Sequence, residues 1–422
     1  MNFDKKQPPR WKRKVAAFLF GQGISLFGSQ LVQMAIIWHV TLETSSGIWV
    51  TILTLASFLP QMLISPIAGV WADRYNRKTI MMLSDTAIAI TTLLLALFMM
   101  SGNTGKAALP VIIIVSAIRS LGGGIHPPAV NAALPQIIPE DMLSRINGYN
   151  GTIQSIVQFV SPIAAGAIMA VGPIYNILFI DVATAIIGIG ILAMLKIPKH
   201  QPAPKTEKTS SFAEMREGFR FTWNNRFLRK LFATYGLYIF LCVPSGFLTA
   251  LMIKRTFGDN IMFLTVNEAV GFAGSVLAGL LLGATGGCKN RVKTLFLGML
   301  VYGAASLAIG FTNVFWLFAV LMFFIGLTIP AAQTSVFTLV QEKVEPSMMG
   351  RVFSLLNVMF CGFMPLGMVI FGPLADVVRI QTMVIVCAVP IILLAINLLL
   401  SRGFYREGIH TPEVGETGDN QA

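Results

Sequence analysis

The chain has 422 residues, of which 55% are hydrophobic and only 12% are charged. Soluble domains carry about 25% charged residues, so this composition excludes an ordinary soluble protein and leaves no room for a separate soluble catalytic domain. The net charge is +12, but the basic residues are scattered over short polar segments between long apolar runs. Membrane topology and anionic lipid explain such a distribution, and we therefore expect no nucleic-acid partner.

Apolar runs long enough to cross a bilayer fill most of the chain. A helix of about 20 residues crosses a hydrocarbon core of roughly 30 Å, whereas the strands of a membrane barrel alternate over about ten residues. We therefore predict an all-α membrane protein with twelve transmembrane helices in two six-helix halves. The predicted spans are 15–40, 48–71, 79–101, 108–133, 144–171, 175–197, 229–253, 262–285, 294–312, 315–340, 350–374 and 381–401.

The longest polar stretch, residues 198–228, divides the predicted spans six and six. It begins with a proline-rich segment that cannot continue a helix. Four apolar side chains then recur at helical spacing, which predicts an amphipathic helix on the cytoplasmic membrane surface. They are Phe212, Met215, Phe219 and Trp223. The predicted domains are residues 1–197 for the amino-terminal half, 198–228 for the linker, 229–403 for the carboxyl-terminal half and 404–422 for a polar cytoplasmic tail.

Lys and Arg are distributed unequally between the two sides of this topology. With the amino terminus in the cytoplasm, 26 of them fall in cytoplasmic segments or at the cytoplasmic ends of spans, and only Arg119 lies deep inside a span. The four on the opposite side are Lys106, Lys254, Arg255 and Arg379. Because cytoplasmic loops carry an excess of Lys and Arg, we predict cytoplasmic termini in a multi-pass protein of the cell membrane. The first run is too long for a cleaved signal peptide.

Short matches recur in the same order in the two predicted halves. Asn76-Arg77 recurs as Asn290-Arg291, 214 residues later, and Arg145 recurs as Arg351, 206 residues later. Duplication of a six-helix unit is typical of transporters that bind their substrate between two repeats.

The loop after the second span reads Gly-Val-Trp-Ala-Asp-Arg-Tyr-Asn-Arg-Lys over residues 69–78. It resembles the G-x-x-x-D-R-x-G-R-[RK] loop of the major facilitator superfamily, the twelve-helix secondary transporters. Asn76 stands where the pattern has glycine, and asparagine tolerates a left-handed backbone better than most residues. The resemblance implies a gating motif, whose residues here are Gly69, Asp73, Arg74, Arg77 and Lys78.

As a gate, this loop would lock the outward-open state. Asp73 would bond to the start of the eleventh span near 347–351, where the positive helix end favours an anion. Arg77 would pair with Glu140 or Asp141. The alternative reading is that the loop only anchors the topology through its positive charges.

Arg119 lies near the middle of the fourth span and is followed by three glycines, 122–124. It resembles the buried arginine that the superfamily carries in this helix. A charge at this depth is costly and needs a partner. Arg119 would bind an acidic substrate, tune proton exchange with a carboxylate, or satisfy helix carbonyls as a structural strut. The glycines allow a close helix contact or a bend.

Three carboxylates lie inside predicted spans: Asp85, Asp181 and Glu268. Intramembrane acids are candidates for coupling because they are costly when charged. The superfamily arrangement places the third and sixth helices at the periphery and the eighth beside the cavity. Glu268 is therefore our first choice for the proton carrier and Asp181 the second, while we expect Asp85 to be structural.

The fifth span contains Ser161, Pro162 and Gly166, a weakened copy of the Gly-Pro-x-x-Gly-Gly element of the superfamily's exporters. This favours export over import, although an ordinary proline kink explains the same residues. His126 follows in the fourth span beside two prolines, and we expect it to be a packing residue.

The chain as a whole resembles the macrolide-efflux (Mef-type) branch of the superfamily, next to the enterobactin exporters. The stretches that carry this resemblance include 33–37, 118–120, 180–181 and 350–354. It implies proton-coupled export of amphipathic small molecules, such as macrolide-type drugs or related metabolites, by alternating access. We expect a monomer in the lipid bilayer with no cofactor and no metal, since the four cysteines show no metal-ligand spacing.

Other functions remain open at this point. An importer or a siderophore exporter on the same fold differs only in the weak element of the fifth span. An enzyme would need a phosphate-binding loop, a metal motif or a convergent nucleophile, and the sequence contains neither G-x-x-x-x-G-K-[ST] nor H-E-x-x-H. A sensor would need an appended soluble domain, and an ATP-driven pump would need a separate ATPase chain. We therefore do not expect an enzyme.

Overall fold

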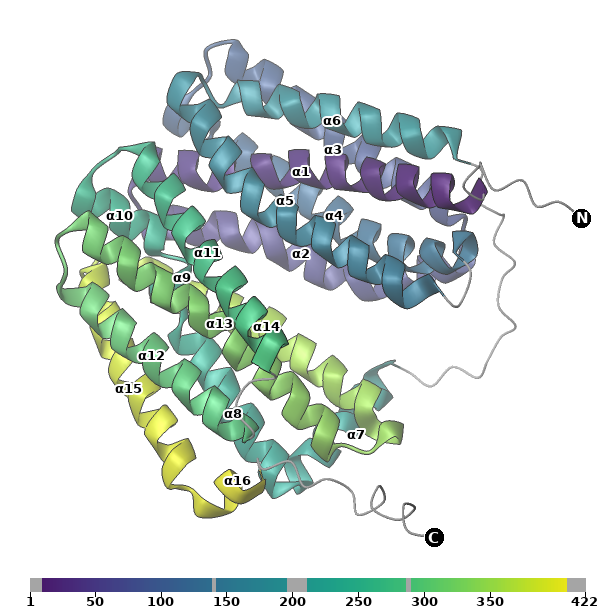
Figure 1. Ribbon diagram of the computed structural model, residues 1–422. Helices are drawn as coiled ribbons and strands as arrows, with labels where there is room; N and C mark the ends of the chain where they lie inside the picture. The colour runs from purple at the N-terminus through teal and green to yellow at the C-terminus, as the bar shows by residue number, and fades with distance from the viewer. Residues whose placement is uncertain (1–9, 139–141, 196–210, 286–289, 408–422) are drawn as a thin grey trace, which may run out of the picture. The chain divides into compact units, whose positions relative to one another are not determined.

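A computed structural model describes residues 10–138, 142–195, 211–285 and 290–407, and within these ranges the chain is helical without strands (Figure 1). The first helices are α1 (Arg10–Thr44), α2 (Gly47–Arg74), α3 (Arg77–Met100), α4 (Leu109–Ile137), α5 (Leu143–Val171) and α6 (Tyr175–Met194), with a short 3-10 turn, η1 (Gly105–Ala108), before α4. The others are α7 (Ser211–Asn224), α8 (Arg226–Leu241), α9 (Val243–Gly246), α10 (Thr249–Phe257), α11 (Ile261–Thr285), α12 (Arg291–Phe311), α13 (Phe315–Lys343), α14 (Pro346–Leu374), α15 (Ile380–Leu400) and α16 (Arg402–Glu407).

Ten of the described helices are long and apolar enough to cross a membrane. The two remaining predicted spans are 229–253 and 350–374. The second corresponds to α14, whose described apolar stretch is Gly362–Leu374. The all-α membrane fold is confirmed, and the helix count is consistent with twelve spans.

The seventh span differs from the prediction of one helix over 229–253. The structure divides it into α8, α9 and α10. Pro244 stands in the first turn of α9, where it lacks an N–H to donate and where its ring would clash with the carbonyl of Phe240 in a continuous helix. The hydrophobic run predicted the crossing but not the break, because the apolar residues continue through it.

Asparagine side chains cap four of the described helices. Asn76, Asn225, Asn260 and Asn290 accept hydrogen bonds from backbone N–H groups in the first turns of α3, α8, α11 and α12. Asn76 has φ −66° and ψ 112°, so our expectation of a left-handed turn at this position is wrong. Its role is to satisfy N–H groups that have no partner inside the helix.

The chain forms two compact units. The first contains residues 1–208, 248–269 and 368–377, and the second contains 209–247, 270–367 and 378–422. Segments from the predicted carboxyl-terminal half therefore group with the amino-terminal helices. The boundaries that we predicted for the two halves and the linker remain predictions.

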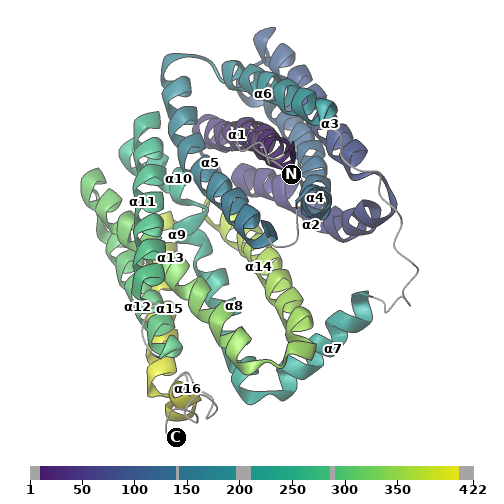
Figure 2. The same ribbon diagram turned by 45° about the vertical axis from the view of Figure 1, so that its right-hand side comes forward.

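In the first unit, α4 packs against α2 and α3, and α1 packs against α5 and α6. A Cβ atom on Gly122 would lie 2.6 Å from the Ile88 side chain of α3, and one on Gly124 would lie 2.7 Å from the backbone of Gln61 in α2. The glycines after Arg119 therefore permit close packing on two sides. In the second unit, α12 packs against α13 and α15 (Figure 2).

The linker contains the expected amphipathic helix, α7. Phe219 and Trp223 stack with ring centroids 5.5 Å apart and remain 52% and 57% exposed. The stretch of the linker before Ser211 lies outside the described residues.

Candidate functional site

The centre of the first unit holds a buried ion pair. Nη1 of Arg119, on α4, lies 2.5 Å from Oδ2 of Asp181, on α6. The two side chains are 8% and 1% exposed. Thr92 of α3 completes the group, because it accepts from Arg119 and its hydroxyl donates to Asp181 Oδ2 at 3.2 Å. The carboxylate partner that Arg119 requires is therefore Asp181.

The helices around this pair approach each other through small residues. A Cβ on Gly28 of α1 would lie 2.9 Å from Asp181 Oδ1 and would also collide with Thr184. The carbonyl of Ser29, one residue later, lies 3.5 Å from Nη2 of Arg119. A charge left alone at this depth would be costly, whereas the pair is neutral as a whole. Sequence analysis found both residues but not their pairing, since depth in a span does not reveal which way a side chain faces.

Asp85 and His126 form a second close pair between α3 and α4. His126 Nε2 lies 3.4 Å from Asp85 Oδ1, an ion-pair distance if the imidazole is protonated. No hydrogen bond to Nε2 is found in the part of the chain that the structure describes. His126 thus faces a carboxylate instead of packing only against apolar neighbours.

Glu268 lies on α11 and is half-buried. Its carboxylate has no hydrogen bond or ion pair with the described residues of the first unit. The neighbouring Asn267 is 4% exposed, and its Oδ1 also has no hydrogen-bond partner among the described residues. An isolated carboxylate within a span is a candidate for a group that gains and loses a proton.

The element in the fifth span lies beside Glu268. Ser161 is fully buried and Pro162 is inside α5. A Cβ on Gly166 would collide with the side chain of Thr265, which stands one turn before Glu268 on α11. Gly166 therefore lets α5 and α11 touch next to the candidate proton carrier.

The cations of the loop over 69–78 bind helix ends. Arg77 donates from Nε to Ala72 O at 3.0 Å and from Nη1 to Ala132 O at 2.7 Å. Lys78 Nζ donates to Ala193 O at 2.6 Å and Leu195 O at 2.8 Å, at the end of α6. Cations are favourable at the negative ends of helices. The side chain of Asp73 and the residues Glu140 and Asp141 lie outside the described residues, so the predicted latch stays a prediction.

A groove of about 570 Å³ lies between the first turns of α1 and α5. Its lining is mostly apolar, with Leu19 and Ile153 among the contributors, and Lys12 and Arg145 add positive charge. Arg145 Nε donates to the hydroxyl of Tyr149 at 2.9 Å. The groove can accommodate an amphipathic molecule, but its cations disfavour a positively charged one.

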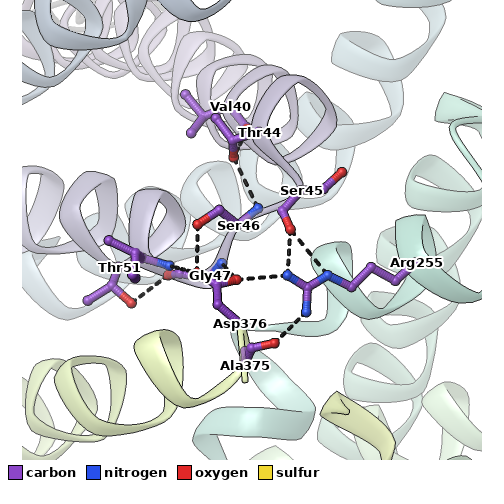
Figure 3. Close-up of polar contacts among 10 residues, drawn as sticks. Val40, Thr44, Ser45, Ser46, Gly47, Thr51, Arg255, Ala375 and Asp376 are labelled. Carbon is purple, nitrogen blue, oxygen red and sulfur yellow. Dashed lines mark hydrogen bonds and ion pairs between the residues drawn. The ribbon is translucent and has the colours of Figure 1, made fainter. Parts of the chain in front are cut away.

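A polar cluster at the other end of α1 was missed by sequence analysis. Arg255, on α10, and Asp376, after α14, form an ion pair of 2.8 Å that also binds the turn between α1 and α2 (Figure 3). The two residues are 121 positions apart, and neither belongs to a recognisable motif. The only signal in the sequence was that each lies just beyond an apolar run.

The sequence matches the Major Facilitator Superfamily over residues 16–364 and again over 268–414. The chain belongs to this superfamily. Macrolide efflux protein A of Streptococcus pyogenes is 32% identical over 395 residues, which cover 92% of this chain and 95% of that protein. The multidrug efflux pump Tap of Mycobacterium bovis (strain BCG / Pasteur 1173P2) is 25% identical over 402 residues, 90% of this chain and 92% of the pump.

Solved structures agree on the fold. A bacterial homologue of the iron transporter ferroportin, in an inward-facing state, superposes with a TM-score of 0.68 at 14% identity, over 92% of this chain and 98% of that one. The predicted superfamily and its macrolide-efflux branch are thus confirmed, as is the membrane transporter fold. The chain is a major facilitator transporter of small molecules, and the roles of its individual residues are matters for proposal.

Proposed function

We propose that this major facilitator transporter exports amphipathic small molecules, macrolide-type drugs or related metabolites, in exchange for protons by alternating access. The observation that supports this most is the 32% identity to Macrolide efflux protein A over almost the whole of both chains. A likeness of this extent covers most of the chain.

Glu268 is the proposed proton carrier. A carboxylate with no partner is costly when charged inside a membrane and is readily neutralised by a proton. Its position next to the contact between Gly166 and Thr265 would link protonation to the packing of α5 against α11. When that contact opens, water would reach Glu268 and the proton would leave.

Asp181 is the second residue that we propose to take part in proton coupling. It holds Arg119 as long as it is ionised, and protonation of its carboxylate would release the guanidinium for another anion. The neutral pair also ties α3, α4 and α6 together, which is the strut that sequence analysis considered. Asp85, beside His126, is proposed to be structural. The loop containing Asp73 is proposed as the cytoplasmic gate.

Uptake into inside-out membrane vesicles tests this function. The vesicles come from an efflux-deficient host that expresses the transporter, and a radiolabelled macrolide is offered with an imposed proton gradient. We expect accumulation above the external concentration and its collapse by an uncoupler. Accumulation that ignores the uncoupler would contradict proton exchange. Equilibration without accumulation would contradict coupling, and no transport of any compound in a chemically varied panel would contradict drug-type export.

A further inference from the structure

The cluster at the outer end of α1 joins the charges of two side chains to the ends of three helices. Asp376 accepts hydrogen bonds from Ser46 Oγ at 2.7 Å, from Gly47 N at 2.7 Å and from Ile48 N at 3.0 Å (Figure 3). These N–H groups belong to the first turn of α2 and have no partner within the helix. Asp376 therefore caps α2 from a distant part of the chain, at the end where the helix dipole favours an anion.

Arg255 makes the complementary contacts. Its guanidinium donates to the carbonyl of Ser45, just after the end of α1, and to the carbonyl of Ala375, just after the end of α14. A third contact binds Asp376 Oδ1 at 2.8 Å. The cation thus meets two negative helix ends and the anion meets one positive helix end, so each charge is stabilised by the ion pair and by the backbone.

Close packing of α2 and α14 lies directly below these charges. A Cβ on Gly47 would collide with the carbonyl of Gly372, and one on Gly372 would collide with the side chain of Thr51. The Thr51 hydroxyl also lies 3.1 Å from the carbonyl of Met368. The contact is thus made by backbone atoms and the small side chains of Thr51 and Ala375.

The participants come from both predicted halves of the transporter. The turn between α1 and α2 belongs to the amino-terminal half, while α10 and the end of α14 belong to the carboxyl-terminal half, and all of them lie within the first compact unit. The predicted topology places this cluster on the outer side of the membrane. Arg255 and Asp376 are 31% and 22% exposed, so water can solvate both charges when they separate.

We propose that Arg255 and Asp376 lock the outer gate of the transporter. The bonds to the ends of α1, α2 and α14 form when the outer side closes and break when it opens. This inference rests on the alternating access proposed above. Burial alone raises the pKa of Asp376, but the hydrogen bonds from Ser46, Gly47, Ile48 and Arg255 outweigh it and hold the pKa below its usual value. The lock is therefore charged at neutral pH.

Reactivity of a cysteine at Thr51 measures the opening of this contact. Thr51 is 5% exposed, so Thr51→Cys, in a chain without its native cysteines, should react slowly with an impermeant maleimide added to intact cells. Adding Asp376→Asn or Arg255→Gln should raise the reaction rate about 5- to 30-fold, since the lost helix cap and the lost ion pair both favour the open state. Unchanged rates in both variants, at equal amounts in the membrane, would overturn the proposal.

Controls on the same side of the protein keep the result specific. Lys254 and Asp259 form an ion pair of 3.5 Å beside Arg255, and Asp259 is 75% exposed. Lys254→Gln should leave the rate at Thr51→Cys unchanged. Asp259→Cys should react rapidly in every background, which establishes the side of the membrane independently of the gate. If Asp376→Asn does not reach the membrane, Ser46→Ala removes one hydrogen bond and should give a smaller increase.

Exchanging the two charges tests whether the lock needs the contacts with the helix ends or only the ion pair. Asp376→Arg combined with Arg255→Asp keeps the pair but places a cation at the start of α2. We expect no return to slow labelling, and a full return would overturn the assignment to helix ends. Labelling needs neither substrate nor proton gradient. A transporter that fails in the vesicle experiment but labels as expected would therefore keep the gate while losing the proposed export.

Discussion

Two arginine–aspartate pairs in the first unit share their chemistry and differ in their surroundings. Arg119 and Asp181 lie deep in the helix packing, 8% and 1% exposed. Arg255 and Asp376 lie at the edge of the same unit, 31% and 22% exposed. Removing one partner of a buried pair costs about 3–5 kcal/mol, because the other charge is left in an apolar medium, whereas exposed pairs contribute about 0–1 kcal/mol.

This difference in exposure indicates which ion pair is suited to break during the proposed transport cycle. Water replaces the lost partner at the edge, so the outer pair is suited to repeated breaking. The inner pair has no such replacement, so separating its two charges is costly. The same two side chain types thus make a buried ion pair in one place and, in our proposal, a reversible contact in another.

The largest effect should come from breaking the inner pair. Arg119→Leu leaves Asp181 buried and unpaired, and we expect about 3–5 kcal/mol of lost stability, seen as a lower thermal midpoint and poor recovery in detergent. Arg119→Lys should restore stability only partly, because it lacks the planar fork. The double variant Arg119→Leu with Asp181→Leu should regain stability but not transport. Normal transport by the double variant would reduce the pair to a strut.

Glu268→Gln should abolish uphill uptake into vesicles with little change in stability, because the described residues form no hydrogen bond or ion pair with this carboxylate. Exchange of substrate down its gradient should continue, since a permanently neutral side chain still permits both gates to move. Asp259→Asn, on the exposed surface, is the matched control and should transport normally. Uphill uptake by Glu268→Gln would transfer the coupling role to Asp181.

The loop over 69–78, which the predicted topology places in the cytoplasm, extends the comparison to the opposite side of the membrane. Asp73→Asn should insert and fold normally, because the loop is at the water edge, yet transport should fall several-fold if Asp73 closes that side. Maleimide labelling of Thr51→Cys should change in the opposite sense to its response to Asp376→Asn, since weakening the cytoplasmic gate favours the state closed outside. Transport at the normal rate would leave the loop as a topology anchor.

Mildly acidic pH should have the smallest effect on the opening of the proposed gate. The pKa of Asp376 lies below its unfolded value of about 3.9, so its stabilisation is present above that value and is lost only as the pH falls through the still lower folded pKa. The labelling rate of Thr51→Cys, divided by that of the exposed Asp259→Cys to cancel the pH dependence of the thiolate, should therefore stay constant between about pH 5.5 and 8. A rise in this ratio as the pH falls within this range would show that protonation opens the gate well above the usual pKa of a carboxylate.

The sequence predicted the fold because hydrophobic length is a local property that survives folding. It placed Arg119, Asp181 and Glu268 within long apolar helices for the same reason. It did not predict the pairing of Arg119 with Asp181, which depends on the rotation of two helices, or the break at Pro244, where apolar residues continue through a non-helical turn. The proposed outer lock joins positions 45–48 to Arg255 and Asp376, and no local pattern connects residues so far apart.

The asparagine caps have a consequence for how the chain enters the membrane. Asn76, Asn225 and Asn290 are each followed by an arginine. That arginine is the first helical residue, where the dipole of its own helix disfavours a cation, and Arg77 offsets this by donating to carbonyls near the ends of α2 and α4. The cap stabilises the same turn by about 1 kcal/mol. Each Asn-Arg pair thus fixes where a helix starts and holds its charge at the water edge. During biosynthesis, three helices would begin at one defined depth as they partition into lipid.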